Sequence, residues 1–229
     1  MKILFLLIFS ATFANDQSWD EKLFYSASFG GVDVATATLK SKKIKNIDDQ
    51  DILRIEFKAK SKPSLKYIFP INDKIIVDVD LNTWQPLKVE KKIREGSYKQ
   101  NSLSTYDHKN NMLFYKNDSI SYDGKVFNPY SLIYYFRTLD FSSNANYKIQ
   151  VVDNKKVTPL KFFTDKKVKL KTAYGTFYAN RVWPKKINGE PFKNAGKITM
   201  WISDKDKLPI IINLKMKFGS LNLELEEVN

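Results

Sequence analysis

The stretch Leu53-Arg-Ile-Glu-Phe-Lys-Ala-Lys60 alternates between apolar and charged residues at every position. Successive side chains of a β-strand point to opposite faces, so this alternation predicts a strand with one buried face and one solvated face. A sheet that packs one face on a core and turns the other to water is typically antiparallel. The side chains expected on the buried face are Leu53, Ile55, Phe57 and Ala59.

The same period of two recurs on both sides of this stretch. It predicts further strands over residues 23–29, 32–39, 168–170, 198–202, 210–218 and 221–225. Turn-forming pairs such as Gly30-Gly31 and Asp123-Gly124 separate the runs. Turns at intervals of about 8–12 residues are typical of antiparallel sandwiches and barrels. The basic run Lys40–Lys45 is expected to be a loop.

One segment has helical periodicity instead. Asn128 is a favourable helix N-cap, and Pro129 suits the first helical position. An apolar stripe at helical spacing follows within residues 130–140, and its members are Leu132, Ile133, Phe136 and Leu139. A single helix of about three turns needs a sheet to cover. The fold expected is therefore mainly β: an antiparallel curled sheet, a half-barrel or an open barrel, with one main helix on its concave face.

The N-terminus has the features of an export signal. Lys2 precedes the apolar run Ile3–Phe9, and small residues end at Ala14. This arrangement is typical of a secretory signal peptide, and the run is shorter than the roughly 20 residues that span a bilayer. We expect residues 1–14 to be a signal peptide and residues 15–229 to form a single β-rich domain.

The chain contains no cysteine. It therefore forms no disulfides and offers no thiolate nucleophile or metal–thiolate site. It also lacks the residue on which a bacterial lipoprotein anchor is built. The expected location is the periplasm, as an exported, soluble protein without a lipid anchor.

The formal net charge is +13 at pH 7, and the basic residues are spread along the chain without forming a tail. Diffuse positive charge has three interpretations: solubility, attraction to an acidic membrane or polysaccharide, and nucleic-acid binding. An exported protein rarely meets nucleic acid, so no nucleic-acid partner is expected. The first two interpretations stay open at this point.

Catalytic motifs are absent from the sequence. The chain has no Gly-x-Ser-x-Gly elbow, no His-Glu-x-x-His pair and no phosphate-binding glycine loop. Its single histidine, His108, is expected in an exposed turn. One histidine without any cysteine does not favour a zinc site. We therefore expect no enzymatic activity, no catalytic residues, no cofactor and no metal.

Four groups of residues carry a resemblance to a known family. They are Glu21–Tyr25 with Phe29–Val32 and Ala35–Ala37; Pro129–Arg137, with its Tyr-Tyr-x-Arg; Gly175–Phe177 before a strand ending at Pro184; and Trp201–Asp204 with Leu208-Pro209 and Phe218–Ser220. In their order and spacing the chain resembles the exported bacterial family called domain of unknown function 3108. It departs from the family at Ala35, where glycine is expected, and at Lys205, where a second aspartate is usual.

The resemblance implies a secreted β-rich domain similar in architecture to periplasmic lipoprotein carriers, in which a helix covers the apolar cavity of a half-open barrel. It implies no activity. Our first hypothesis is a non-enzymatic periplasmic binding or carrier protein for an amphipathic, anionic envelope molecule, either a lipid or a lipid-linked glycan. The candidate ligand-binding residues are Leu132, Ile133, Tyr134, Phe136, Arg137 and Trp201.

The role of Arg137 has two interpretations. It would neutralise the carbonyl groups at the C-terminus of its helix, or it would present its guanidinium fork to an anionic head group. Two alternative functions also remain. One is a module that binds acidic polysaccharide through exposed aromatic and lysine side chains; the other is an envelope assembly or structural factor without a small ligand. Peripheral membrane contact is compatible with all of these functions, and the sequence does not determine the oligomeric state.

Overall fold

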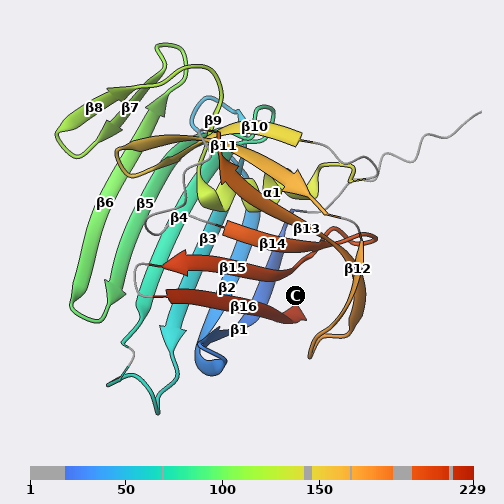
Figure 1. Ribbon diagram of the computed structural model, residues 1–229. Helices are drawn as coiled ribbons and strands as arrows, with labels where there is room; N and C mark the ends of the chain where they lie inside the picture. The colour runs from blue at the N-terminus through green and yellow to red at the C-terminus, as the bar shows by residue number, and fades with distance from the viewer. Residues whose placement is uncertain (1–18, 69, 142–145, 166, 188–197, 217–218) are drawn as a thin grey trace, which may run out of the picture.

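The computed structural model describes residues 19–68, 70–141, 146–165, 167–187, 198–216 and 219–229 (Figure 1). The predicted signal peptide, residues 1–14, and Phe218 of the predicted closing hairpin lie outside these ranges. The strands are β1 (Glu21–Phe29), β2 (Val32–Lys45), β3 (Asp51–Ser61), β4 (Asn72–Asp80), β5 (Pro86–Glu95), β6 (Tyr98–Asp107), β7 (Met112–Tyr115), β8 (Asp118–Ser121), β9 (Val126–Phe127), β10 (Asn146–Asp153), β11 (Lys156–Thr164), β12 (Val168–Lys171), β13 (Thr176–Lys186), β14 (Ile198–Ser203), β15 (Pro209–Met216) and β16 (Gly219–Val228).

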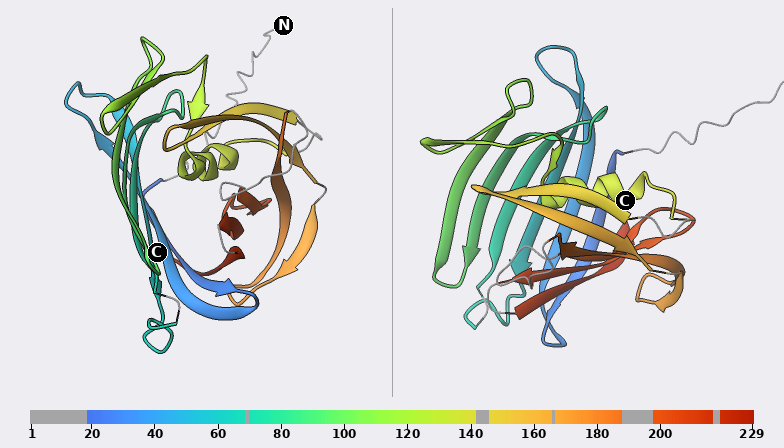
Figure 2. Two further views of the ribbon diagram at one scale, coloured as in Figure 1. Left: turned by 60° about the vertical axis from the view of Figure 1, so that its left-hand side comes forward. Right: turned by 45° about the horizontal axis from the view of Figure 1, so that its top comes forward.

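These strands form a single sheet made of two wings. In the first wing β1 to β8 pair in chain order, and in the second β16 is followed by β15, β14, β13, β11, β10 and β9. The first strand β1 pairs antiparallel with the last strand β16 and so joins the wings in the middle of the sheet. The sheet ends at β8 on one side and at β9 on the other, and it is not closed. Both wings curl toward each other, as Figure 2 shows.

The alternation of apolar and charged residues in Leu53–Lys60 is confirmed. On β3 the side chains of Leu53, Ile55, Phe57 and Ala59 are at most 5% exposed, whereas Lys58 and Lys60 are exposed. Inward-facing residues of both wings meet in one apolar core. The sheet is therefore wetted on its convex side and packed on its concave side, and the predicted fold class is confirmed.

The expected loop at Lys40–Lys45 is wrong, because these residues continue β2 and pair with β3 as far as Lys45 opposite Asp51. The carboxylate of Asp51 lies 3.0 Å from the ammonium of Lys43 and 3.1 Å from that of Lys45. An acidic residue on the partner strand offsets the repulsion among the lysines. A basic run in an alternating strand thus remains regular structure.

The helix α1 spans Pro129–Arg137 and lies on the concave side of the sheet (Figure 2). The Asn128 side chain accepts a hydrogen bond from the Tyr130 amide at 2.9 Å, and Ser131 Oγ accepts one from the Asn128 amide at 3.0 Å. This capping box fixes the start as the sequence predicts. The helix is nine residues long and ends earlier than predicted, at Thr138, whose hydroxyl donates to the Tyr135 carbonyl at 2.7 Å.

Candidate functional site

Four of the predicted ligand-binding residues belong to the filled core beneath α1. Leu132, Ile133, Tyr134 and Phe136 are at most 2% exposed. The Phe136 ring lies 4.9 Å from the ring of Phe162 on β11. None of the four lines the cavity that lies beside the N-terminus of the helix. The apolar stripe of the helix therefore packs the fold, and the cavity lies beside it.

Arg137 is buried in an internal ion pair. Both terminal nitrogens of its guanidinium donate to the carboxylate of Glu21, with Nη2 at 2.9 Å from Oε2. Its Nε donates to the Lys207 carbonyl at 2.9 Å, across the core and away from the helix's own carbonyl groups. The guanidinium also lies 5.3 Å from the ring centre of Trp19 and 5.1 Å from that of Tyr134. The guanidinium of Arg137 therefore binds partners inside the protein. It neither neutralises the carbonyl groups of its own helix nor faces an anionic head group, which were the two roles expected from the sequence.

Trp201 is separated from the other predicted residues. Its neighbours Met200 and Ile202 on β14 belong to the core, so the half-buried Trp201 points to the convex face. There it pairs with Arg181 of β13 and with Ile211 of β15. The structure thus places Trp201 on the outer surface of the second wing.

A cavity of about 150 Å³ lies between the wings, beside the N-terminus of α1. Its apolar lining comes from β3, β4 and β5 on one wing and from β14, β15 and β16 on the other. The apolar side chains are Phe57, Ala59, Ile71, Ile75, Ile93, Ile198, Leu214 and Leu221, with Pro129 and Tyr130 at the helix. An apolar cavity between two curled wings is the feature that the family resemblance implies.

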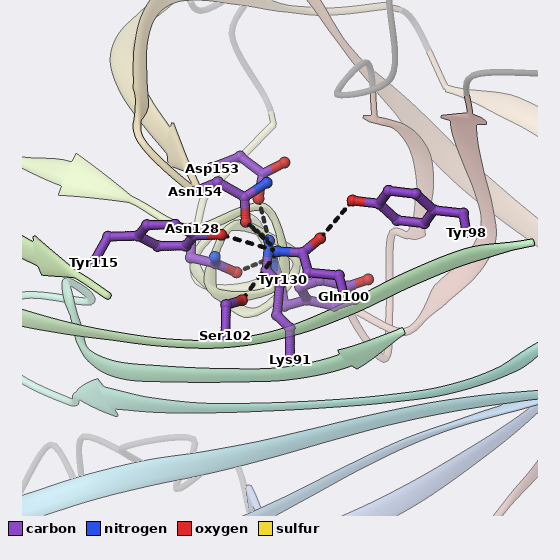
Figure 3. Close-up of polar contacts among 9 residues, drawn as sticks. All are labelled: Lys91, Tyr98, Gln100, Ser102, Tyr115, Asn128, Tyr130, Asp153 and Asn154. Atoms are coloured by element: carbon purple, nitrogen blue, oxygen red, sulfur yellow. Dashed lines mark hydrogen bonds and ion pairs between the residues drawn. The ribbon is translucent and has the colours of Figure 1, made fainter. Parts of the chain in front are cut away.

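The cavity also has a polar side formed by inward-facing charged residues. Lys91 is buried, with its side chain 8% exposed, and its ammonium forms an ion pair with Asp153 of β10. The same ammonium lies 3.3 Å from Asn154 Oδ1, which accepts a second hydrogen bond from Gln100 Nε2 at 2.7 Å. Figure 3 shows these four residues, which we call the Lys91–Asp153 cluster, together with Tyr130.

The Lys91–Asp153 cluster joins the two wings where the backbone does not. Lys91 and Gln100 belong to β5 and β6 of the first wing, whereas Asp153 and Asn154 lie at the turn between β10 and β11 of the second. The outer strands β8 and β9 are not paired with each other. Side-chain contacts therefore hold this edge of the curl together, and side chains rearrange more readily than a backbone ladder does.

Two carboxyl groups, those of Asp73 and Glu95, form a pair at the same cavity. Burial and the neighbouring charge of Asp73 raise the pKa of Glu95 to about 7, and burial also raises the pKa of Asp73. The Arg94 amide donates to Asp73 Oδ1 at 2.8 Å and so holds that carboxylate in place. The two side chains are hydrogen-bonded to each other, and two neighbouring carboxylates repel, so the pair retains a proton near neutral pH. The cavity thus offers both a proton donor and an acceptor to a polar group of a ligand.

A second hollow, of about 460 Å³, lies on the convex side of the same rim. Ala59 and Asp73 face the cavity, so the next residues along their strands, Lys60 and Asn72, face the opposite side. Its charged lining consists of Lys60, Lys66, Arg94 and Lys99, and no carboxylate is among the lining residues. We call it the basic hollow. Ile71 borders both the cavity and the basic hollow.

These site residues were missed because a charged residue in an alternating strand is assumed to face water. Asp73 lies in register with the buried residues Ile75 and Val77, and Lys91 lies in register with Val89. The signal that would have found them is a charged residue at an inward position of a strand. Such positions are unusual because a buried charge requires a partner.

His108 is fixed at both ring nitrogens. Its Nε2 lies 2.8 Å from the Pro86 carbonyl oxygen and its Nδ1 lies 2.8 Å from the Tyr122 hydroxyl. His108 lies in a turn, as expected, but its ring is half-buried, so the expected exposure is wrong. With Nε2 donating to the carbonyl, Nδ1 accepts from the hydroxyl, and both nitrogens connect neighbouring strands. Within the described ranges, no three His, Asp or Glu side chains come together as a metal site would need.

The sequence matches the family described as "Protein of unknown function (DUF3108)" over residues 25–226. The chain therefore belongs to this family, and the resemblance drawn from the sequence is confirmed. A comparison with curated proteins gives no match.

Among solved structures, the fold is similar to that of a beta-barrel-like protein of domain of unknown function DUF1849 from Brucella abortus. The TM-score is 0.58, the sequences are 8% identical, and the match covers 91% of this chain and 96% of that one. At this identity the similarity concerns the fold alone. In the part of the chain that the structure describes, no helix is both long and apolar enough to cross a membrane.

Proposed function

We propose that this protein is a non-enzymatic, exported binding or carrier protein for an amphipathic, anionic molecule of the cell envelope, a lipid or a lipid-linked glycan. The apolar part of the ligand lies in the cavity between the wings, and its anionic part lies at the basic hollow. One observation carries the proposal: an apolar cavity and a hollow lined by four cationic side chains meet at a single rim residue, Ile71. The positive end of the site is thus supplied by Lys60, Lys66, Arg94 and Lys99 in place of Arg137.

The size of the cavity limits what it holds in the closed form. A cavity of about 150 Å³ is comparable to one that accepts benzene, so it takes only a short part of an acyl chain. A longer chain requires the wings to separate. The Lys91–Asp153 cluster is one of the side-chain contacts that have to open, because β8 and β9 share no backbone hydrogen bonds; the ion pair of Lys155 with Asp118 is another. A carrier needs such a reversible opening to take up and release its cargo.

The experiment that tests this proposal is a titration with a fluorescent fatty acid, cis-parinaric acid, whose emission rises in an apolar site. Ile93→Trp fills the cavity and is expected to weaken binding at least tenfold, because the added ring occupies the space of the chain. Ile76→Trp is the matched control. Ile76 is also half-buried, but it lies on the convex face between the core residues Ile75 and Val77, so binding is expected to stay unchanged.

A second pair of probes tests the basic hollow. Arg94→Glu combined with Lys99→Glu is expected to weaken binding of the anionic probe several-fold and to leave binding of a neutral fatty alcohol unchanged. If the folded Ile93→Trp variant bound the fatty acid as tightly as the unchanged protein does, the proposal would be contradicted.

An acidic-polysaccharide module is the second candidate, and one surface favours it. On the convex face of the second wing the rings of Phe163 and Trp183 stack at 4.9 Å. Lys185 lies 5.1 Å and Arg181 lies 5.7 Å from the centre of the Trp183 ring. These cations cover the ring faces on which a sugar would stack, so this surface ranks behind the cavity. If the protein were retarded in gels containing alginate and Trp183→Ala abolished the retardation, the binding site would be assigned to this surface.

A further inference from the structure

The loop between β3 and β4 presents apolar side chains to solvent. Tyr67 is 84% exposed and Ile68 is 69% exposed, and they are neighbours in sequence. Two hydrogen bonds of 3.0 Å, from the Leu65 amide to the Lys62 carbonyl and from the Ile68 amide to the Leu65 carbonyl, fold the loop into successive turns. Leu65 packs against the core and anchors this arrangement. Residues 62–68 of the loop therefore hold both apolar side chains outward.

The loop projects beyond the rim of the first wing (Figure 1). The basic hollow lies directly beside it, because Lys66, Pro63 and Pro70 belong both to the loop and to the lining of the hollow. The ammonium of Lys66 lies 4.8 Å from the centre of the Tyr67 ring. The exposed apolar tip thus lies next to a hollow lined by cations, while Lys62 is engaged in an ion pair with Asp33.

We propose that the β3–β4 loop docks on the surface of an anionic lipid bilayer, with Tyr67 and Ile68 at the headgroup boundary and with Lys60, Lys66, Arg94 and Lys99 facing lipid phosphates. Tyrosine is favoured at this depth because its ring is apolar and its hydroxyl stays hydrated. Each basic side chain close to an anionic membrane adds a further attraction that falls off within a Debye length. Insertion of the two apolar side chains and attraction of the basic side chains to lipid phosphates thus both contribute to binding at the same rim.

A protein partner fits these observations less well. Two apolar side chains offer far less than the roughly 1,200 Å² that a stable protein–protein interface buries. Binding to a bilayer requires no complementary shape, and an anionic bilayer attracts a surface that carries only positive charge. The basic hollow is such a surface. Docking at this rim also brings Ile71, which borders both the basic hollow and the cavity, to the membrane. The inference does not require a bound ligand and so stands apart from the proposed carrier function.

The molecule contains a natural control for this loop. Ile47, in the turn between β2 and β3, is 99% exposed, yet the same turn carries Asp48 and Asp49. It is an exposed isoleucine in an acidic setting. A membrane of negative charge is expected to attract the tip at Ile68 and to repel the turn at Ile47.

The test is co-sedimentation with sucrose-loaded vesicles of equal parts phosphatidylglycerol and phosphatidylcholine, compared with vesicles of phosphatidylcholine alone. The protein is expected to bind the anionic vesicles at least tenfold more tightly, with the difference shrinking as salt is raised. The double variant Tyr67→Ser/Ile68→Ser is expected to lose at least tenfold in affinity for the anionic vesicles. Ile47→Ser is expected to bind like the unchanged protein.

Insertion is measured separately through a single cysteine, since the chain contains none. Ile68→Cys carrying a nitrobenzoxadiazole label is expected to shift its emission to the blue with anionic vesicles, and Ile47→Cys is expected not to. Equal binding by the Tyr67→Ser/Ile68→Ser variant, equal binding to uncharged vesicles, or binding only to a soluble acidic glycan would overturn the inference. Tyr67→Ser/Ile68→Ser is expected to retain cis-parinaric acid and Ile93→Trp to retain vesicle binding, so failure of one proposal is distinguishable from failure of the other.

Discussion

Buried charge has opposite arrangements in two regions of this molecule. At the C-terminus of α1, Arg137 and Glu21 have opposite charges, and the guanidinium makes two hydrogen bonds to the carboxylate in a fully packed surrounding. At the cavity, Asp73 and Glu95 have the same charge and face empty space. The first arrangement neutralises itself and leaves nothing for a ligand. The second requires a proton or a polar partner and retains room for one.

The difference separates a residue that holds the fold from residues that line the cavity in which we propose that a ligand binds. Arg137 was a candidate because an arginine beside aromatic residues is a common anion ligand, but each of its three guanidinium nitrogens donates a hydrogen bond inside the protein. Glu95 was not a candidate because it is one acidic residue among many. Its raised pKa of about 7 results from burial beside Asp73. An incompletely satisfied inward charge is thus the better indicator of a site here.

The largest expected effect is on the Arg137–Glu21 pair. Arg137→Met leaves the Glu21 carboxylate largely buried without its partner, so the free energy of unfolding is expected to fall by about 3–5 kcal/mol. Urea denaturation measures the change. The double variant Arg137→Met/Glu21→Met removes both charges and is expected to recover at least half of the loss. If the single variant were as stable as the unchanged protein, the pair would not hold the fold.

A smaller effect is expected at the Lys91–Asp153 cluster. Lys91→Met removes one of the links between the wings, but Asp153 is 44% exposed and is rehydrated, so the expected loss of stability is about 1–2 kcal/mol. Binding of long-chain relative to short-chain fatty acids is expected to increase, because the wings separate more easily. Lys88→Met on the convex side of the same strand is the control, since Lys88 pairs with the exposed Glu90. An unchanged chain-length preference in Lys91→Met would argue against opening at this edge.

The carboxyl pair predicts a pH dependence of stability. The pKa of Glu95 in the folded protein, about 7, lies above its unfolded value of 4.5, so the protonated side chain favours the folded state. This contribution is complete below pH 4.5 and is lost as the pH rises through 7. Asp73 of β4 is the partner of the Glu95 carboxyl. The other titratable groups that line the same cavity are Lys91 of β5, Tyr130 of α1 and Asp153 of β10.

Glu95→Gln removes the titration while keeping the shape of the side chain. The unchanged protein is expected to be less stable at pH 8 than at pH 5.5, and the variant is expected to narrow that difference by about 1 kcal/mol, a value reduced for partial exposure to solvent. Thermal unfolding at the two pH values measures it. Identical pH profiles for the two proteins would show that the pair does not titrate in this range.

The smallest effect is expected at an exposed ion pair of the same residue types. Lys155 and Asp118 are 54% and 52% exposed. Lys155→Met is expected to change the free energy of unfolding by no more than about 0.5 kcal/mol. Comparing the losses of unfolding free energy in Arg137→Met, Lys91→Met and Lys155→Met tests whether the loss increases with the burial of the ion pair. A loss above about 2 kcal/mol at this position would remove burial as the explanation.

Much of the fold was predictable because local patterns determine it. The alternation in Leu53–Lys60 and the Asn128-Pro129 helix start both agree with the structure. The pairing of β1 with β16 was not predictable, because no local pattern connects strands at opposite ends of the chain.

The site was less predictable for a related reason. Glu21 and Arg137 are 116 residues apart, and Asp73 and Glu95 lie on different strands. Whether a charged residue faces water or a cavity depends on such long-range partners. The expected ligand residues on α1 were correct as apolar positions, but apolar periodicity does not distinguish a packed core from the lining of a cavity.

A ligand-binding cavity is tested most directly by native mass spectrometry of the protein isolated from its native cells, followed by lipid extraction of the same sample. The expected result is one amphiphile per chain in the unchanged protein and in Ile76→Trp, and none in Ile93→Trp. A bare protein mass in all three, unchanged after envelope lipids are added, would contradict a carrier function.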